Sequence, residues 1–246
     1  MNYTDFNHAC EKIFSLNKFL PMPSDDQVKK LFDLTEIMLE TNKKMNLTAI
    51  TDTNAIILKH YVDSLTVCSV TDIPQESAVI DVGCGAGFPS LPLAIFRRDL
   101  QITSLDSTEK RINYVKSTAF ALGLTNIKTI SGRAEDCANM IEYREKFDTV
   151  TARAVAPLPV LSEICLPFVK PGGAFIAMKA AQGESEITEA KKAIEFCGGV
   201  LRSVHKIEIT ANGIDNEQRI IVDIEKVKKT PDKYPRRYSQ ISKNPL

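Results

Sequence analysis

The architecture of this chain follows from one stretch of its sequence, Ala78-Val79-Ile80-Asp81-Val82-Gly83-Cys84-Gly85-Ala86-Gly87-Phe88-Pro89. The first five residues are typical of a buried β-strand, and a proline after the glycines is typical of the first turn of a helix. A dinucleotide fingerprint needs a third glycine where Phe88 stands, and a P-loop needs Gly-Lys-Ser/Thr. The remaining pattern, Asp-x-Gly-x-Gly-x-Gly, lets the backbone approach a ligand and places the charge of Asp81 near it. It favours a cationic nucleoside without phosphates over a pyrophosphate.

Short runs of β-branched residues alternate with helical patterns after this stretch, which predicts successive βα units and a parallel sheet with right-handed crossovers. The last two runs are joined by the turn-rich Ala211-Asn212-Gly213. This connection leaves no room for a helix and predicts an antiparallel hairpin. We therefore expect an α/β protein with a seven-stranded, mostly parallel sheet. The expected strands are 78–82, 101–105, 127–131, 147–151, 174–178, 201–210 and 218–227, and the expected helices between them are 88–96, 108–122, 134–141, 157–168 and 184–196.

Helical patterns fill the part of the chain before the glycine-rich stretch. Pro21 and Pro23 precede Ser24-Asp25-Asp26-Gln27, which has the spacing of a capping box, and an apolar stripe follows it. We expect helices at about 4–19, 24–43 and 54–67. Residues 1–70 are thus predicted to form an N-terminal helical extension, and residues 71–246 the α/β domain with its C-terminal tail.

Composition limits the class of protein. The 246 residues are 43% hydrophobic and 25% charged, which excludes disordered, collagen-like and coiled-coil chains. The six cysteines form no Cys-x-x-Cys pair and have no His at ligand spacing, so we expect neither a metal site nor a disulfide framework. No apolar run approaches the roughly 18 residues of a membrane span, and the first residues do not resemble a signal peptide. We expect a cytoplasmic protein, monomeric by default, without a membrane partner.

The charge is balanced over the whole chain but not along it. Basic and acidic residues number 31 each, and the last 21 residues hold seven of the basic ones and one of the acidic ones, a net charge of +6 that leaves −6 for the remainder. Tyr234 and Tyr238 alternate with Arg236 and Arg237, a mixture suited to base stacking and phosphate contact. With Lys243, these residues favour RNA contact by the tail over a tail that is merely solvated.

A second acidic residue follows Asp81 at an informative distance. Asp106 ends the second expected strand, 25 positions further on, where a carboxylate can accept hydrogen bonds from both hydroxyls of a ribose. With the glycine-rich turn, it points to S-adenosylmethionine, a cationic nucleoside without phosphates. Ala134 and Glu135 follow the third expected strand, where a class I S-adenosylmethionine-dependent methyltransferase contacts the adenine. The sequence therefore predicts this Rossmann-like methyltransferase fold.

Motifs along almost the whole chain add a family resemblance. They are Asn46-Leu47-Thr48-Ala49-Ile50, His60-x-x-Asp63-Ser64-Leu65, Asp81 through Pro92, Leu105-Asp106-Ser107 with Lys110-Arg111, Arg133-Ala134-Glu135-Asp136, Phe147-Asp148 with Arg153-Ala154, Lys170-Pro171-Gly172-Gly173, and Tyr234-Pro235-Arg236-Arg237 with Lys243-Asn244-Pro245-Leu246. Through them the chain resembles the bacterial small-subunit rRNA methyltransferase G family, also called glucose-inhibited division protein B. The resemblance implies transfer of a methyl group from S-adenosylmethionine to N7 of a guanine in the 530 loop of 16S rRNA, free or within the small ribosomal subunit.

The resemblance also implies which residues contact the cofactor. The family's contacts fall on Gly83, Phe88, Asp106, Ser107, Thr108, Ala134, Glu135 and Arg153, and the glycine-rich stretch itself adds Asp81 and Gly85. Two positions depart from the family pattern. Cys84 stands where serine or threonine is more usual, and Ala180 instead of glycine follows Lys179.

The residues also limit the methylation chemistry. The fourth expected strand ends in Thr151-Ala152-Arg153-Ala154, without the Asn/Asp-Pro-Pro-aromatic loop of enzymes that methylate exocyclic amines, and no cysteine follows a proline, as is typical for C5 methylation of a pyrimidine. Guanine N7 carries an exposed lone pair and no proton, so its attack requires alignment and desolvation but no general base. No residue is therefore predicted with certainty to be catalytic, and the candidates are Arg153, His60 and Asn46.

Two alternatives stay open at this point. A methyltransferase of the same fold can act on a small molecule or a protein, because this scaffold hosts many acceptors. A non-catalytic RNA-binding or cell-division factor can keep the fold and lack turnover.

Overall fold

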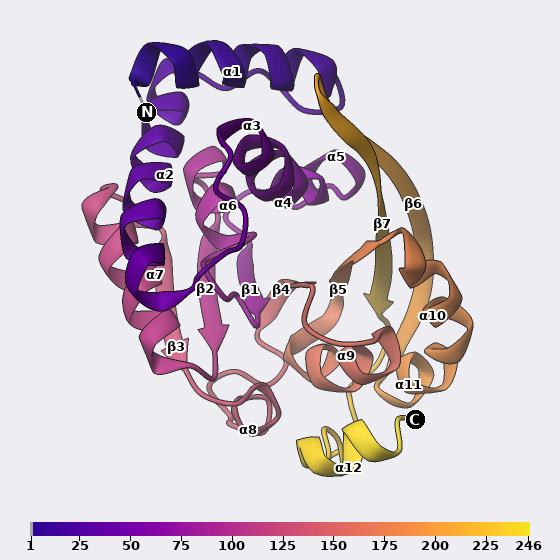
Figure 1. Cartoon of the computed structure of the whole chain (residues 1–246). Helices are drawn as coiled ribbons and strands as arrows, with labels where there is room; N and C mark the ends of the chain where they lie inside the picture. Colours follow the sequence, from indigo (N-terminus) through magenta and orange to yellow (C-terminus); the bar gives the residue numbers. More distant parts are fainter. Residues whose placement is uncertain (1) are drawn as a thin grey trace.

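The computed structural model describes residues 2–246 and contains a seven-stranded sheet in the order β3-β2-β1-β4-β5-β7-β6 (Figure 1). The first five strands run parallel, and β7 pairs antiparallel with both of its neighbours. The predicted sheet and its terminal hairpin are thereby confirmed. The strands are β1 (Ala78–Val82), β2 (Gln101–Asp106), β3 (Ile127–Ser131), β4 (Phe147–Arg153), β5 (Val169–Ala180), β6 (Gly199–Ala211) and β7 (Ile214–Lys226).

Helices connect the parallel strands, but two of them differ from the sequence pattern. α8 ends at Cys137 although apolar residues continue to Ile141. There the Ala138 carbonyl accepts a hydrogen bond from Arg144 Nη1 at 3.2 Å, and Ile141 is largely exposed. The pattern from 184 to 196 is interrupted at Ala190. The helices are α6 (Ser90–Phe96), α7 (Glu109–Ala121), α8 (Ala134–Cys137), α9 (Leu158–Cys165), α10 (Glu184–Glu189) and α11 (Lys191–Phe196).

Three helical stretches precede the sheet. Ser24 caps the second one as predicted, since its N–H donates to Gln27 Oε1 at 2.8 Å and its hydroxyl accepts from the Gln27 N–H at 3.4 Å. The third stretch is not a single α-helix, because it contains a π-helical turn, a widening that is frequent at functional sites. This turn carries His60 and ends just before Asp63. The elements are α1 (Tyr3–Leu16), α2 (Asp25–Met45), α3 (Thr53–Ile56), the π-helix (Ile57–Val62), α4 (Asp63–Leu65) and α5 (Val67–Val70).

Buried hydrophobic residues form two cores, one on each face of the sheet. Successive residues of a strand point to opposite faces, and accordingly Val79 belongs to one core and Ile80 to the other. The core around Val79 contains residues of α1, α2 and the π-helix together with residues of α6 and α7. The N-terminal helices therefore pack on one face of the sheet in a continuous core, and the segment 46–63 is held beside the glycine-rich turn.

The C-terminal tail is packed against the domain. It ends in α12 (Tyr238–Lys243), a short helix that the sequence analysis did not predict, which lies beside α8 and α9 at the bottom of Figure 1. The Arg144 guanidinium donates to the carbonyl groups of Thr230, Pro231 and Tyr234 over distances of 3.0, 3.2 and 3.0 Å. The tail therefore has a defined path along the protein surface.

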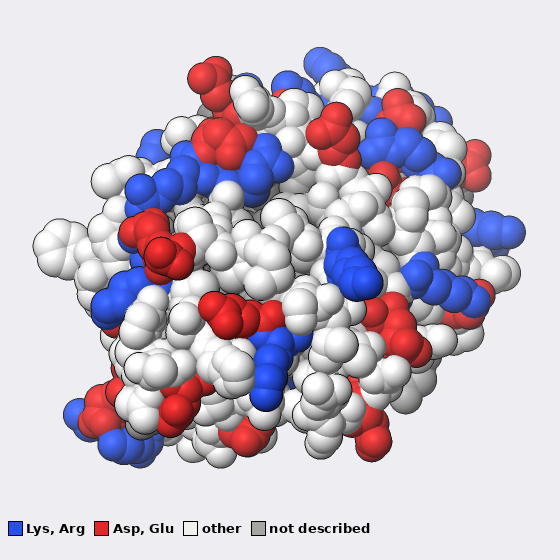
Figure 2. All heavy atoms as spheres, turned by 90° about the horizontal axis from the view of Figure 1, so that it is seen from above, with Lys and Arg blue, Asp and Glu red and all other residues white. Residues whose placement is uncertain are grey.

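Charged side chains are mixed on the face that carries α1. Figure 2 shows the molecule from this side, with basic and acidic residues interspersed and neither sign dominant. Within residues 2–246, no helix has the length and apolar character needed to cross a membrane.

Candidate active site

The glycine-rich turn between β1 and α6 is tied to the end of β2. The N–H groups of Gly83 and Cys84 both donate to the Leu105 carbonyl, at 2.8 and 3.0 Å. Gly83 has a φ of +75°, and a Cβ atom built on it would lie 2.6 Å from Val155 Cγ2. Only glycine adopts this backbone conformation without strain and without that collision. The turn thus depends on glycine for both conformation and space.

Asp81 lies beneath this turn with its side chain in the protein interior. Its side chain is fully buried, with Oδ2 accepting the Ser90 N–H at 3.1 Å and Oδ1 accepting the Thr151 hydroxyl at 3.3 Å. Burial raises the pKa of Asp81 to about 6, although hydrogen bonds from Ser90 oppose the shift. The expectation that its charge lies beside the cofactor is corrected accordingly, because the carboxylate borders neither of the cavities described below and instead joins β1, β4 and the start of α6.

A smaller cavity of about 350 Å³ lies beyond the ends of β1 to β4. Asp106 faces it while one carboxylate oxygen accepts the Gly85 N–H at 3.0 Å and the other the Thr108 N–H at 2.8 Å. Each oxygen keeps a lone pair for a further donor, so the carboxylate can still receive both ribose hydroxyls. These residues fit the adenosyl part of S-adenosylmethionine. Six predicted cofactor residues line this cavity: Gly83, Asp106, Ser107, Thr108, Ala134 and Glu135.

A larger cavity of about 630 Å³ adjoins the smaller one. Gly83, Arg111 and Ala154 line both cavities, so the two meet at the glycine-rich turn. An extended ligand can therefore place a nucleoside in one and its other end in the second. The larger cavity also holds the predicted residues Gly85, Phe88, His60 and Arg153.

A series of ion pairs lines the larger cavity. Asp63 accepts hydrogen bonds from Arg219 Nε at 2.9 Å and from Arg153 Nη1 at 3.0 Å. Glu217 continues the series, with Oε2 at 2.6 Å from Arg219 Nη2 and Oε1 at 2.5 Å from Lys59 Nζ. Burial acts to raise the pKa of Glu217, but the hydrogen bonds from Lys59 and Arg219 outweigh it and hold that pKa below its usual value. We call these five residues the ion chain.

An aromatic stack lies beside the ion chain. The rings of His60 and Phe88 are nearly parallel, with centroids 4.6 Å apart, and the Arg153 guanidinium lies 5.4 Å from the centre of the Phe88 ring. His60 Nε2 is hydrogen-bonded to Thr48 Oγ1 at 2.9 Å. Burial, together with the charge of Arg153, lowers the pKa of His60 to about 4, so the imidazole is neutral at pH 7.

Asn46, a candidate from the sequence, lies outside both cavities. It is the exposed C-cap of α2, with a left-handed backbone at φ +49°, a conformation in which asparagine is enriched. The following residues Leu47 and Thr48 do line the larger cavity. The structure therefore gives Asn46 the role of ending α2. The chain turns there, and Leu47 and Thr48 reach the larger cavity.

Two of the predicted RNA-binding residues are engaged within the chain. Glu163, which is fully buried, accepts hydrogen bonds from Arg236 N, Nε and Nη2 at 2.9, 2.8 and 2.6 Å. Tyr234 is only 7% exposed. In this structure neither residue is presented to an RNA, whereas Arg237 and Lys243 are exposed.

Sequence reasoning missed several residues that line the larger cavity. Glu217 and Arg219 lie two positions apart on β7 and therefore on one face of the strand. That spacing is visible in the sequence, but their approach to Lys59 and Asp63 is not. Asp63 itself stands in a quoted family motif, which is the one signal that could have selected it.

A family model described as "rRNA small subunit methyltransferase G" matches residues 27–218. The chain belongs to this family. The ribosomal RNA small subunit methyltransferase G of Clostridium botulinum (strain ATCC 19397 / Type A) is 44% identical over 223 residues, which cover 91% of this chain and 92% of that protein. The protein of the same name from Geobacillus sp. (strain WCH70) is 46% identical over 211 residues, 86% and 87% of the two chains.

As a member of the methyltransferase G family, the chain is an S-adenosylmethionine-dependent enzyme that methylates RNA of the small ribosomal subunit. Solved structures show the same class I fold at low sequence identity. TYW2 of M. jannaschii in complex with AdoMet matches with a TM-score of 0.55 at 16% identity, over 73% of this chain and 80% of that one. TrmN from Thermus thermophilus matches with a TM-score of 0.51 at 19% identity, over 67% and 48%.

Proposed function

We propose that the enzyme transfers the methyl group to N7 of a guanine in the 530 loop of 16S rRNA, and that N7 attacks the methyl carbon in line without a general base. The family supports an rRNA substrate. The choice of atom and of mechanism is supported by the ion pairs of the carboxylates around the larger cavity and by the low pKa of His60.

Every carboxylate that lines the larger cavity is paired with a cation, and this observation carries the proposal. Asp63 and Glu217 belong to the ion chain, and Glu186 Oε2 lies 2.8 Å from Lys179 Nζ. The oxygens of these carboxylates are thus already engaged by cationic side chains, and at Glu217 the hydrogen bonds from Lys59 and Arg219 also lower the pKa. A substrate that must lose a proton is poorly served by carboxylates engaged in this way.

His60 is a poor base as well. Its pKa of about 4 makes it a weak proton acceptor near neutral pH, and Nε2 is already hydrogen-bonded to Thr48. Guanine N7 needs no such acceptor, because its lone pair is free and it carries no proton. S-adenosylmethionine supplies the electrophilic methyl group when bound. The contribution of His60, Phe88 and Arg153 is then to exclude water and to hold the reacting groups in line.

The charges around the larger cavity suit a polyanionic substrate. Five cationic side chains and three carboxylates line it. The cations are Lys59, Arg111, Arg153, Lys179 and Arg219, and the carboxylates are Asp63, Glu186 and Glu217. The excess of cations favours phosphate groups near the cavity, and such contacts position a nucleic acid. The exposed Arg237 and Lys243 are further candidates for RNA contact.

The test is methyl transfer to 16S rRNA and to small subunits from cells that lack this enzyme, followed by nucleoside digestion and mass spectrometry. The expected product is 7-methylguanosine from the 530 loop, formed at a rate that is constant between about pH 7 and 8 at saturating substrates, since the attack of N7 needs no general base. The matched control is an RNA with 7-deazaguanine at the target position, which should bind but accept no methyl group. Methylation of the 7-deaza RNA, or of another atom in the natural RNA, would exclude N7 as the acceptor.

A further inference from the structure

One wall of the smaller cavity comes from the C-terminal tail. Tyr238, the first residue of α12, lines this cavity together with Asp106, Ala134, Glu135 and Val155. Among the described residues that line it, Tyr238 is the one contributed by the tail, and the others lie between Val82 and Ile164. The cofactor side of the site is thus completed by a residue far from it in the sequence.

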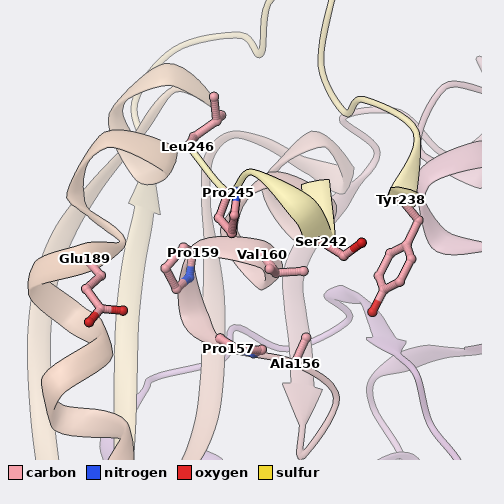
Figure 3. A pocket seen from close by; sticks show the side chains of 9 residues that line it. All are labelled: Ala156, Pro157, Pro159, Val160, Glu189, Tyr238, Ser242, Pro245 and Leu246. Atoms are coloured by element: carbon pink, nitrogen blue, oxygen red, sulfur yellow. The ribbon is translucent and has the colours of Figure 1, made fainter. Parts of the chain in front are cut away.

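The ring of Tyr238 stands between two cavities. A third cavity of about 460 Å³ lies between α9 and the end of the chain, and Figure 3 shows Tyr238 at its edge, across from Glu189. The side chain extends from the start of α12 in the direction of the loop that carries Ala156 and Pro157 (Figure 3). Tyr238 is 40% exposed. Tyr238 is therefore not buried in the core, and it borders the space of both cavities.

The residues around Tyr238 fix its position. Two residues earlier, Arg236 makes its three hydrogen bonds to the buried Glu163, and its Nη2 also donates to the Asn244 carbonyl at 3.1 Å, beyond the far end of α12. Three residues later, Ile241 is fully buried in the core around Ile80. Anchors on both sides of Tyr238 make it part of a preformed wall.

We propose that Tyr238 binds the adenosyl group of S-adenosylmethionine through its ring, and that Arg236 and Glu163 act as positioning residues for this contact. Aromatic side chains bind a base through its π-face. The ring borders the cavity next to Ala134 and Glu135, on the side where Asp106 can hold the ribose. This role concerns the cofactor alone and does not depend on which atom of the RNA is methylated.

Calorimetric titration of the RNA-free protein tests the proposal. Tyr238→Ala should raise the Kd for S-adenosylmethionine and for 5′-methylthioadenosine by the same factor, about 5- to 100-fold, the range for loss of stacking on one base. Tyr238→Phe should stay within about twofold of wild type, because it keeps the ring. Ser239→Ala is the matched control, since Ser239 is adjacent and exposed but lines neither cofactor cavity.

The positioning role has a separate readout. Arg236→Ala should weaken both ligands, and the double variant Arg236→Ala with Tyr238→Ala should lose no more affinity than Tyr238→Ala alone, since the first residue acts through the second. Equal affinities of wild type and a folded Tyr238→Ala protein would overturn the proposal, as would a loss confined to S-adenosylmethionine. If Tyr238→Ala does not fold, Tyr238→Leu replaces it, and full affinity of that variant would have the same meaning.

Discussion

Asp63 Oδ1 and Arg219 Nε lie 2.9 Å apart, although 156 positions separate the two residues in the sequence. The contact joins the start of α4 to β7, and thus links the N-terminal helices to the hairpin at the edge of the sheet. Both side chains are largely buried, at 8% and 13% exposure. Both residues of this ion pair line the larger cavity.

Asp63→Ala tests the importance of the ion chain for stability. The substitution leaves Arg153 and Arg219 without their shared carboxylate, and removal of one partner from a buried ion pair costs about 3 to 5 kcal/mol. We expect the free energy of unfolding, measured in urea, to fall by about 3 kcal/mol. Glu184→Ala is the control, because its pair with Lys206 is exposed and should contribute less than about 1 kcal/mol. Equal effects of the two variants would contradict the role of the ion chain.

Asp106→Ala tests the ribose contact. The variant loses the carboxylate that accepts from Gly85 and Thr108 and that faces the smaller cavity. Hydrogen bonds to a charged group contribute about 1.5 to 3 kcal/mol, so we expect the Kd for S-adenosylmethionine, measured by calorimetry, to rise about 10- to 100-fold. Asp99→Ala is the control, since Asp99 pairs with Arg97 outside both cavities. An unchanged Kd for Asp106→Ala would rule out the contact.

Gly83→Ala separates backbone strain from contact with the cavity wall. Gly83 and Gly213 have nearly the same φ, +75° and +77°, but only at Gly83 would a Cβ atom meet a neighbour, Val155. Both alanine variants should lose about 1 to 2 kcal/mol of stability through strain. Only Gly83→Ala should also weaken cofactor binding, and Val155→Ala in the same protein should restore part of it. Loss of cofactor affinity in Gly213→Ala would contradict this assignment.

His60 should make stability depend on pH below neutrality. Its pKa is about 4 in the folded protein and about 6.5 in the unfolded chain, so between these values the unfolded state binds the extra proton. The free energy of unfolding of wild type relative to His60→Gln should therefore rise between pH 4 and 6.5, by about 3 kcal/mol, and stay constant above that range. Denaturant titrations at several pH values measure this difference, and a flat profile would show that the imidazole is not desolvated.

Asp81 should act in the opposite direction. Its pKa is about 6 when folded and about 3.9 when unfolded, so the folded state holds the proton over that interval. The stability of wild type relative to Asp81→Asn should fall by about 2 to 3 kcal/mol as the pH rises from 4 to 6. Gly213→Ala changes no titrating group and should differ from wild type by a constant amount. A difference that rises with pH would reverse the assignment.

Much of the fold could be predicted because its signals are local. Three of these signals are the strand before the glycines, the capping box at Ser24 and the alternation of β-branched runs with helical patterns. Each depends on residues a few positions apart. The predicted helix 134–141 failed for the opposite reason. An apolar pattern cannot show that Arg144 takes the Ala138 carbonyl and that Ile141 faces solvent. The missed helix α12 is short, and its place depends on contacts with α9 made over long sequence distances.

The sequence was sufficient for the succession of strands and helices along the chain, the glycine-rich turn and the acidic residue at the end of β2, because strand alternation, backbone conformation and the offset between neighbouring βα units are properties of short segments. The tertiary structure alone revealed that Asp81 is buried, that Asp63 and Arg219 meet, and that the basic tail folds back so that Arg236 pairs with Glu163 and Tyr238 borders the cofactor cavity. A charge or an aromatic ring has the same sequence signature whether it is solvated or paired. The partner of a charged or aromatic side chain is determined only when the packing of the two cores brings distant segments together. For this reason the function of the tail could not be assigned from its composition.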